Sequence, residues 1–136
     1  MKGKNENIAA NAAIRNTHTT LNFNPNASFE VKIETFNDTV NAGFSAASRK
    51  VAEIGGPKRI ECLSLVDIDT GKEVFFEEGD EISVGSRKFW DFIKEYPDNN
   101  FAFIHNHNSD GYFSETDLRT LLYNNNIKMF GAIRID

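Results

Sequence analysis

The chain has 136 residues, 40% of them hydrophobic, and a formal charge of −5, which predicts one acidic domain with a hydrophobic core. The acidic balance provides no basic surface of the kind that nucleic-acid binding needs, and no apolar run approaches the roughly 18 residues of a membrane helix. The single cysteine, Cys62, excludes an internal disulfide and a cysteine-rich zinc cluster, and a lone thiol fits a reducing, cytoplasmic compartment.

The first 28 residues contain few large apolar side chains, so we expect a flexible tail or linker there and a single domain over residues 29–136. His18 falls in this tail, and we expect it to have no part in a metal site. The next segment, Phe29–Phe36, alternates apolar and charged residues, which predicts a half-buried strand.

A helix is predicted to begin after Asn37 or Asp38, either of which can cap it. Its apolar residues recur at alternating spacings of four and three, and Gly55-Gly56-Pro57 is expected to end it. The apolar stripe consists of Val40, Phe44, Ala47, Val51 and Ile54.

The remaining pattern alternates strands and helices. We expect strands over Arg59–Asp67 and Glu73–Phe76, joined by a turn at residues 69–72 and followed by an acidic surface loop at 77–81. A helix over Ser86–Glu95 and a strand over Phe101–Ile104 should follow. The last predicted elements are a helix from Ser114 through Leu122 and a strand over Lys128–Ile135. This order predicts an α/β fold in which helices flank a mixed sheet.

The chemistry concentrates directly after the apolar run Phe101–Ile104. His105 and His107 are two residues apart, so on an extended backbone their side chains point to the same face. Asp117 follows ten residues after His107, in the first turn of a predicted helix. Two imidazoles and one carboxylate form a three-ligand site with an open position, which is typical of catalytic zinc.

The residues alone leave alternatives open. Ser114-x-x-Asp117 also fits a capping box at a helix N-terminus, and Asp110, in the polar turn before it, is a second candidate carboxylate ligand. A zinc hydrolase also needs a general base, for which Glu61, at the start of a strand, is the best candidate. The weaker candidates for the base are Glu53, Asp67 and Asp69.

Taken together, Glu61, His105-Asn106-His107 and Ser114-x-x-Asp117 resemble the motif of the JAMM (JAB/MPN-type) zinc metalloproteases. The resemblance covers about residues 38–136 and is closest to the bacterial and phage branch, whose domains accompany phage head morphogenesis proteins and polymorphic toxins. Two features depart from it. Asn108 replaces a common proline, and the spacing from His107 to Ser114 is one residue shorter than in the eukaryotic deubiquitinases.

The resemblance implies a cytidine-deaminase-like JAB/MPN architecture and zinc-dependent cleavage of a peptide or isopeptide bond in a protein substrate. It implies that His105, His107 and Asp117 bind zinc. Glu61 would act as the general base and Ser114 would help to stabilise the oxyanion. It also implies a bacterial or phage-associated setting, with a capsid or portal protein as a possible partner.

Two other classes of function were compared with this one. The first is a phage-associated binding or assembly module whose metal site is structural or vestigial. The second is a nuclease or deaminase, which the sequence does not favour. In the HNH endonucleases the three motif residues are dispersed, whereas residues 105–107 are consecutive, and a zinc deaminase needs a Pro-Cys-x-x-Cys pair that a single-cysteine chain lacks.

Overall fold

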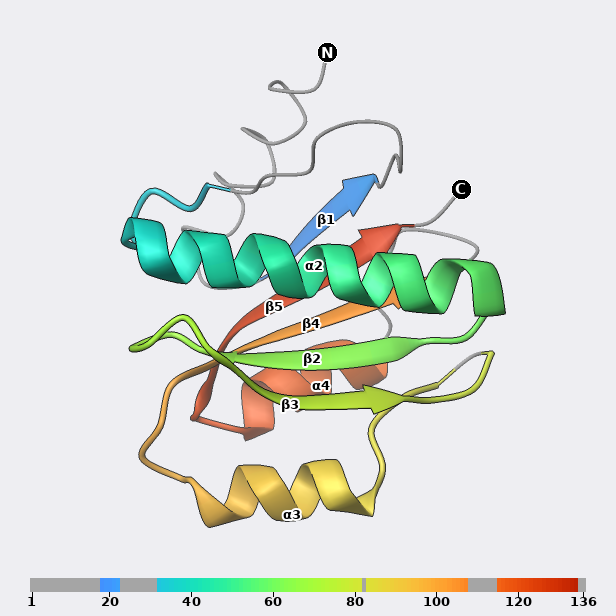
Figure 1. Ribbon diagram of the computed structural model, residues 1–136. Helices are drawn as coiled ribbons and strands as arrows, with labels where there is room; N and C mark the ends of the chain where they lie inside the picture. The colour runs from blue at the N-terminus through green and yellow to red at the C-terminus, as the bar shows by residue number, and fades with distance from the viewer. Residues whose placement is uncertain (1–17, 23–31, 82, 108–114, 135–136) are drawn as a thin grey trace.

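The computed structural model describes residues 18–22, 32–81, 83–107 and 115–134. Over these residues the chain forms five strands and three helices around one sheet (Figure 1). In chain order the elements are β1 (His18–Asn22), α2 (Asp38–Lys58), β2 (Cys62–Asp67), β3 (Glu73–Glu78), α3 (Arg87–Glu95), β4 (Phe101–His107), α4 (Glu115–Tyr123) and β5 (Ile127–Arg134).

The sheet has the strand order β1-β5-β4-β2-β3 and is mixed. Strands β1, β5 and β4 run parallel to one another, whereas β2 is antiparallel to both of its neighbours, β4 and β3. The predicted α/β class, with a mixed sheet and flanking helices, is therefore confirmed.

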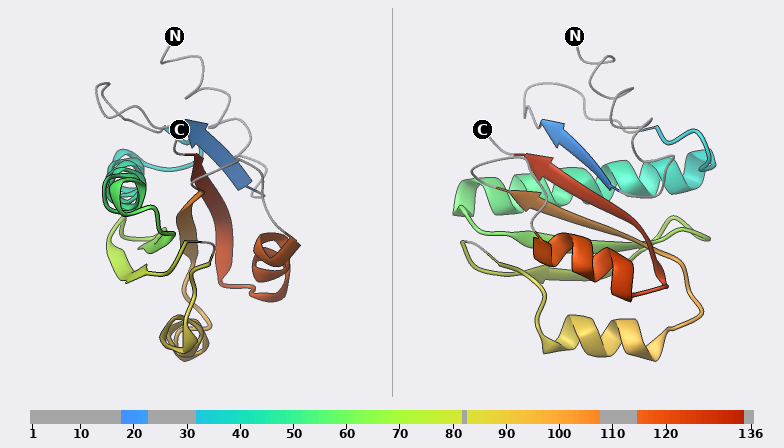
Figure 2. Two further views of the ribbon diagram at one scale, coloured as in Figure 1. Left: turned by 90° about the vertical axis from the view of Figure 1, so that its right-hand side faces the viewer. Right: turned by 180° about the vertical axis from the view of Figure 1, so that it is seen from behind.

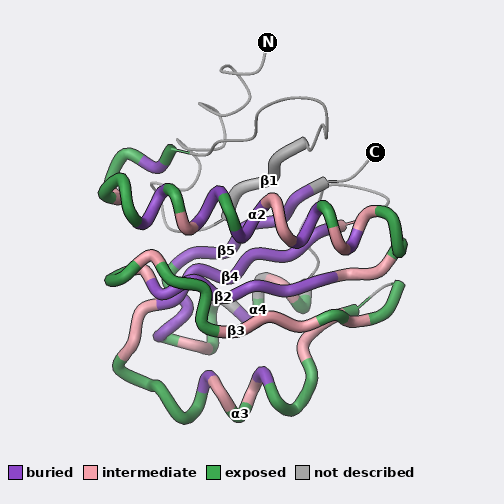
Figure 3. The backbone as a smooth tube through the Cα atoms, in the orientation of Figure 1, coloured by how far each residue is buried: buried purple, intermediate pink, exposed green. Residues whose placement is uncertain are grey.

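The helices cover both faces of the sheet. Figure 2 shows α2 on one side of the sheet and α4 on the other, with α3 beside the edge formed by β3. The central strands β2 and β4 are buried along almost their whole length (Figure 3). Alternating side chains of these strands therefore contribute to two separate hydrophobic cores.

The first core lies under α2 and contains the predicted stripe residues Phe44, Ala47 and Val51. They pack against Val66 of β2 and Ile104 of β4. The second core lies on the opposite face and is largely aromatic. Its buried members are Leu63, Leu65, Phe89, Ile93, Phe101, Phe103, Ile127 and Phe130.

The predicted strand over Phe29–Phe36 is wrong for the part that the structure describes, because residues 34–36 form a turn and a bend. The physical reason is the side chain of Asn41 in α2. Its oxygen accepts a hydrogen bond from Ile33 N at 2.6 Å, and its nitrogen donates to the carbonyls of Ile33 and Phe36, both at 3.1 Å. These bonds replace the partner strand that an extended segment would need.

The predicted end of the first helix at Gly55-Gly56-Pro57 is also wrong, because α2 continues to Lys58. Pro57 lies in the last turn, where a missing N–H removes only one intrahelical hydrogen bond. Arg59 then adopts a left-handed conformation, with φ of 55°, and the N–H groups of Arg59 and Ile60 bond to Gly56 O and Gly55 O at 3.1 Å each. This is a Schellman ending, and it shifts the start of β2 from the predicted Arg59 to Cys62.

The other boundaries differ less from the predictions. Strand β3 extends two residues into the expected acidic loop, and Ser86 is the N-cap of α3 rather than its first residue. Strand β1 lies inside the expected tail and pairs with β5, so the expectation of flexibility does not describe His18–Asn22. Among the helices in the described part of the chain, none has the length and apolarity required to cross a membrane.

Candidate metal centre

Strand β4 carries both histidines at its carboxyl end. His105 lies between Leu63 of β2 and Ala132 of β5 and is 1% exposed, so its ring is fixed inside the sheet. His107 is the last residue of the strand and is partly exposed. Their rings lie on the face that carries the aromatic core, as shown by the edge contact of the His105 and Phe103 rings at 5.3 Å.

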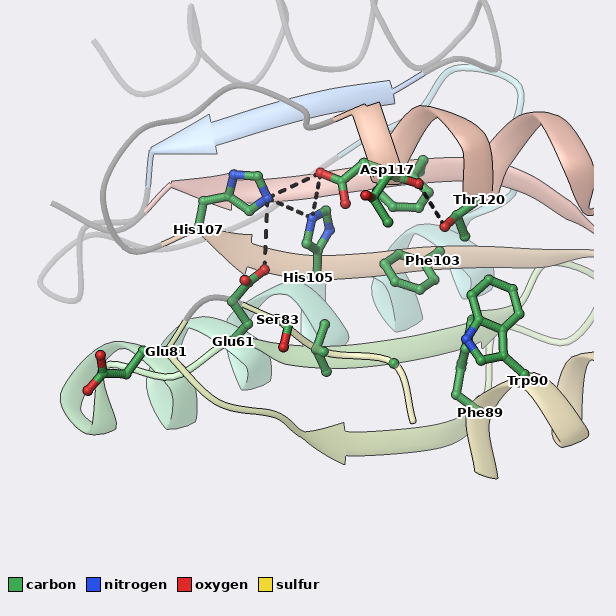
Figure 4. A pocket seen from close by; sticks show the side chains of 14 residues that line it. Glu61, Glu81, Ser83, Phe89, Trp90, Phe103, His105, His107, Asp117 and Thr120 are labelled. Atoms are coloured by element: carbon green, nitrogen blue, oxygen red, sulfur yellow. Dashed lines mark hydrogen bonds and ion pairs between the residues drawn. The ribbon is translucent and has the colours of Figure 1, made fainter. Parts of the chain in front are cut away.

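The nitrogens of the two imidazoles converge on one point (Figure 4). The Nε2 atoms of His105 and His107 are 2.8 Å apart, and Asp117 Oδ2 lies 3.3 Å from each of them. Asp117 belongs to the first turn of α4, so the fold brings it back over the end of β4. The structure therefore brings together the three residues that the sequence predicted to bind a metal.

The backbone of β5 determines which nitrogen of His105 faces this point. His105 Nδ1 is 2.9 Å from the carbonyl oxygen of Gly131. Because a carbonyl only accepts hydrogen bonds, Nδ1 carries the proton and the neutral ring presents the lone pair of Nε2 to the site. Hydrogen bonds of this kind orient histidine ligands in metal sites.

The three atoms have the spacing of ligands around one small cation. A point about 2 Å from all three exists just outside their plane, and zinc–nitrogen and zinc–oxygen bonds are about 2.0–2.2 Å long. The donor set of two imidazoles and one carboxylate also suits zinc. The residues present therefore fit a divalent metal ion, with at least one further position open to the pocket.

Glu61 lies at the other side of the same point. Its Oε1 atom is 4.0 Å from His107 Nε2, and its side chain is 13% exposed. The ligand atoms of Glu61, His105 and His107 all lie within 4.8 Å of one another, so Glu61 is a second candidate carboxylate. Asp117 Oδ2 is nearer to the imidazoles, at 3.3 Å from each Nε2, than Glu61 Oε1 is to His107 Nε2, so both carboxylates are candidate ligands.

The backbone and the burial of Glu61 are both well defined. Its N–H donates to Asp80 O and its carbonyl accepts from Gly79 N, both at 2.7 Å, although the residue precedes β2. Burial raises the pKa of the Glu61 carboxyl, and the electrostatic interaction with the neighbouring His105 and His107 partly opposes this shift. A carboxylate with a raised pKa is a stronger base than one in water.

Asn106, between the two histidines, points to the opposite face of the sheet. It is fully buried and hydrogen-bonds to the residues on both sides of Glu61, accepting from Cys62 N at 2.7 Å and donating to Ile60 O at 2.9 Å. The sequence pattern predicted no role for Asn106 beyond its place in the motif. Its position in the middle of a buried strand, where a polar side chain requires a partner, was the available signal.

The weaker candidates for the base do not lie at the site. Glu53 is exposed on α2 and pairs with Arg49. Asp67 is at the far end of β2, opposite Phe101, where its carboxylate accepts from the N–H groups of Asp69 and Thr70. Two further predicted positions, Asp110 and Ser114, lie outside the described residues.

A cavity of about 460 Å³ opens beside the candidate metal centre. One end is lined by Glu61, His105, His107 and Asp117, and the other by aromatic side chains. Glu81 also lines this cavity, although the acidic segment at residues 77–81 was expected to be surface only. The aromatic side chains that line it are Phe89, Trp90, Phe103 and Phe130.

Comparisons of this chain with protein-family models, with curated proteins and with solved structures found no match.

Proposed function

We propose that the protein is a zinc-dependent hydrolase that cleaves a peptide or isopeptide bond, with a JAMM-like site. The observation that supports this proposal is the convergence of His105 Nε2, His107 Nε2 and Asp117 Oδ2 within 3.3 Å of one another. The carboxylate of Glu61 lies 4.0 Å from His107 Nε2 on the pocket side. The spacing of these residues in the sequence, which resembles the JAMM motif, is an independent support.

Zinc held by these residues would supply a Lewis acid and lower the pKa of a water molecule at the site. Glu61 would accept a proton from the attacking water and deliver it to the leaving amine. Asp117 lies in the first turn of α4, where the positive end of the helix dipole favours a negatively charged group. The proposed role of Ser114, stabilising the oxyanion, follows from the resemblance alone.

Metal stoichiometry, measured by mass spectrometry of the purified chain, tests the site. We expect about one zinc per chain in the parent and none after His107→Ala. His18→Ala is the matched control, because His18 lies on β1, which β5 separates from β4, and this variant should retain the metal. A parent chain that takes up no zinc at neutral pH would contradict the proposal.

Peptidase assays on a panel of peptide and isopeptide substrates test the chemistry. Loss of a positioned general base costs about 10²–10⁴-fold in rate, so Glu61→Gln should keep its zinc and lose turnover. Glu53→Gln, which changes an exposed carboxylate on α2, should leave both unchanged. Zinc binding without activity on any substrate would instead favour an assembly module with a structural metal.

A further inference from the structure

The cavity beside the candidate metal centre has a continuous aromatic wall. Ring contacts run from Trp90 to Phe89 at 4.8 Å, from Phe89 to Phe103 at 5.4 Å and from Phe103 to His105 at 5.3 Å. The wall thus leads directly from α3 to a histidine of the site (Figure 4). A group bound at the metal position and a group bound against this wall would be neighbours.

The rings of Phe89 and Phe103 in this wall are buried and closely packed, whereas Trp90 is partly accessible. Phe89 is 1% exposed and Phe103 is 4% exposed, and the Phe103 ring stacks on Phe130 with centroids 4.3 Å apart. Trp90 is only partly buried, so part of its indole faces the cavity. Side chains that are already packed lose little conformational entropy when a ligand binds against them.

The charges around the cavity disfavour an acidic ligand. Among the described residues that line it, none is Lys or Arg, whereas Glu61, Glu81 and Asp117 are acidic. An aspartate or glutamate side chain would meet three carboxylates and lose its hydration without a partner. An apolar side chain would bury its surface against aromatic rings at no electrostatic cost.

We infer that this cavity is a specificity pocket for a bulky apolar, preferably aromatic, side chain of the substrate, on a residue next to the cleaved bond. The inference rests on the proposed function, because that function places the cleaved bond at the metal position. A volume of about 460 Å³ accommodates such a side chain in addition to the reacting group. Glycine at the same position of a substrate would leave the aromatic wall uncovered.

Two hydroxamates that differ only in this side chain test the inference on the zinc-loaded protein. Acetyl-L-phenylalanine hydroxamate and acetylglycine hydroxamate present the same chelating group to the metal. Trp90 is the chain's one tryptophan, so its fluorescence reports binding in the pocket. We expect the phenylalanine compound to bind roughly 10- to 100-fold more tightly, as burial of one aromatic side chain predicts. A ratio within twofold would overturn the inference.

Isothermal calorimetry on variants then assigns the preference to the wall. Trp90→Ala should reduce the ratio of the two affinities several-fold. Phe92→Ala is the matched control because Phe92 is also a partly buried aromatic residue of α3, but it packs against Phe101 and Tyr96 and does not line the cavity. Trp90→Leu, which preserves most of the apolar volume, provides a second test if the alanine variant does not fold. An unchanged ratio in a folded Trp90 variant would also overturn the inference.

A third probe separates this inference from the proposed function. N-acetyl-L-phenylalaninamide has no chelating group, so its effect on Trp90 fluorescence does not depend on zinc. If the amide binds to a chain that takes up no zinc, the pocket is supported and the hydrolase is not. If both hydroxamates bind the zinc-loaded chain equally, the metal centre is supported and the pocket is overturned.

Discussion

Asn106 Oδ1 accepts a 2.7 Å hydrogen bond from the backbone N–H of Cys62. Asn106 lies between the two histidines and Cys62 follows Glu61, so this bond connects the two halves of the candidate site. The nitrogen of the same amide donates to Ile60 O, on the other side of Glu61. Strand β2 begins at Cys62, so Glu61 itself has no ladder partner on β4. One side chain on β4, together with the backbone bonds of Glu61 to Gly79 and Asp80, therefore holds the backbone from which the proposed base projects.

Asn106→Ala should destabilise the protein and displace Glu61. The substitution leaves the buried N–H of Cys62 and the half-buried carbonyl of Ile60 without this partner, at about 1–3 kcal/mol for a buried group, so we expect a loss of about 2–4 kcal/mol in urea denaturation. The zinc stoichiometry should be unchanged and kcat should fall. Asn100→Ala is the control, because its amide makes only an exposed 3.4 Å contact with Asp69. A stability loss equal to that of the control would show that the two hydrogen bonds contribute nothing.

Gly55 of α2 lies directly against the side-chain amide of Asn106. A Cβ atom at this position would lie 2.6 Å from Asn106 Nδ2 and 2.7 Å from its Oδ1, and the amide cannot move without breaking its bonds to β2. Glycine to alanine in a helix usually stabilises by roughly 0.5–1 kcal/mol. At Gly55 we expect the opposite sign, a loss of stability measured by thermal unfolding.

Gly56→Ala provides the matched comparison for this prediction. Gly56 is the next residue of α2 and is partly exposed, so its substitution should be neutral or slightly stabilising. If Gly55→Ala stabilised the protein as much as Gly56→Ala, the close contact with Asn106 would not restrict the position.

The metal-ligating candidates were predictable because their signals are local. Alternation along a strand puts His105 and His107 on one face, and the buried run before them is predictable from its apolar residues alone. Asp117 was predicted to lie in the first turn of a helix that begins near Ser114, and it lies in the first turn of α4. Helix α2 was predictable for the same reason, since its stripe has helical spacing.

What the sequence did not reveal depends on contacts between distant segments. The turn at residues 34–36 exists because Asn41 replaces a partner strand, and no local pattern encodes that bond. The aromatic residues of α3 form an amphipathic face whichever side of the sheet they cover, so their proximity to His105 could not be inferred. The role of Asn106 likewise depends on a partner 44 residues away in the chain.

Glu61→Gln should stabilise the metal-free protein at neutral pH. Burial raises the pKa of the Glu61 carboxyl, and Asp117 and Asp80 raise it further, while His105 and His107 lower it. A carboxyl whose pKa is higher in the folded than in the unfolded state destabilises the fold when it ionises. The cost is absent below the ordinary glutamate pKa, grows as the pH rises from there to the higher folded-state pKa, and is constant above it.

Urea unfolding at a series of pH values measures this effect. The stability difference between Glu61→Gln and the parent should be near zero at about pH 4, increase as the pH rises above the ordinary glutamate pKa, and level off above the folded-state pKa. Glu53→Gln, at an exposed position, should show no such trend. A difference that is the same at every pH would mean that the ionisation of Glu61 is not coupled to folding.

Ser48→Ala should stabilise the protein. Ser48 is completely buried on α2, and its hydroxyl has no hydrogen-bond partner among the described residues. Removing a buried unsatisfied hydroxyl recovers a desolvation cost of about 1–3 kcal/mol, and alanine has the higher helix propensity. We expect a gain of about 1–2 kcal/mol in urea denaturation.

Ser45→Ala is the control for this gain. Ser45 lies one turn earlier on α2 and is 9% exposed, but it takes part in an interaction with another group. Its replacement should therefore be neutral or destabilising. If Ser48→Ala also lost stability, its hydroxyl would have to be bonded in solution, most simply to the carbonyl one turn back in the helix. The sign of the Ser48→Ala effect thus distinguishes an unsatisfied hydroxyl from a bonded one.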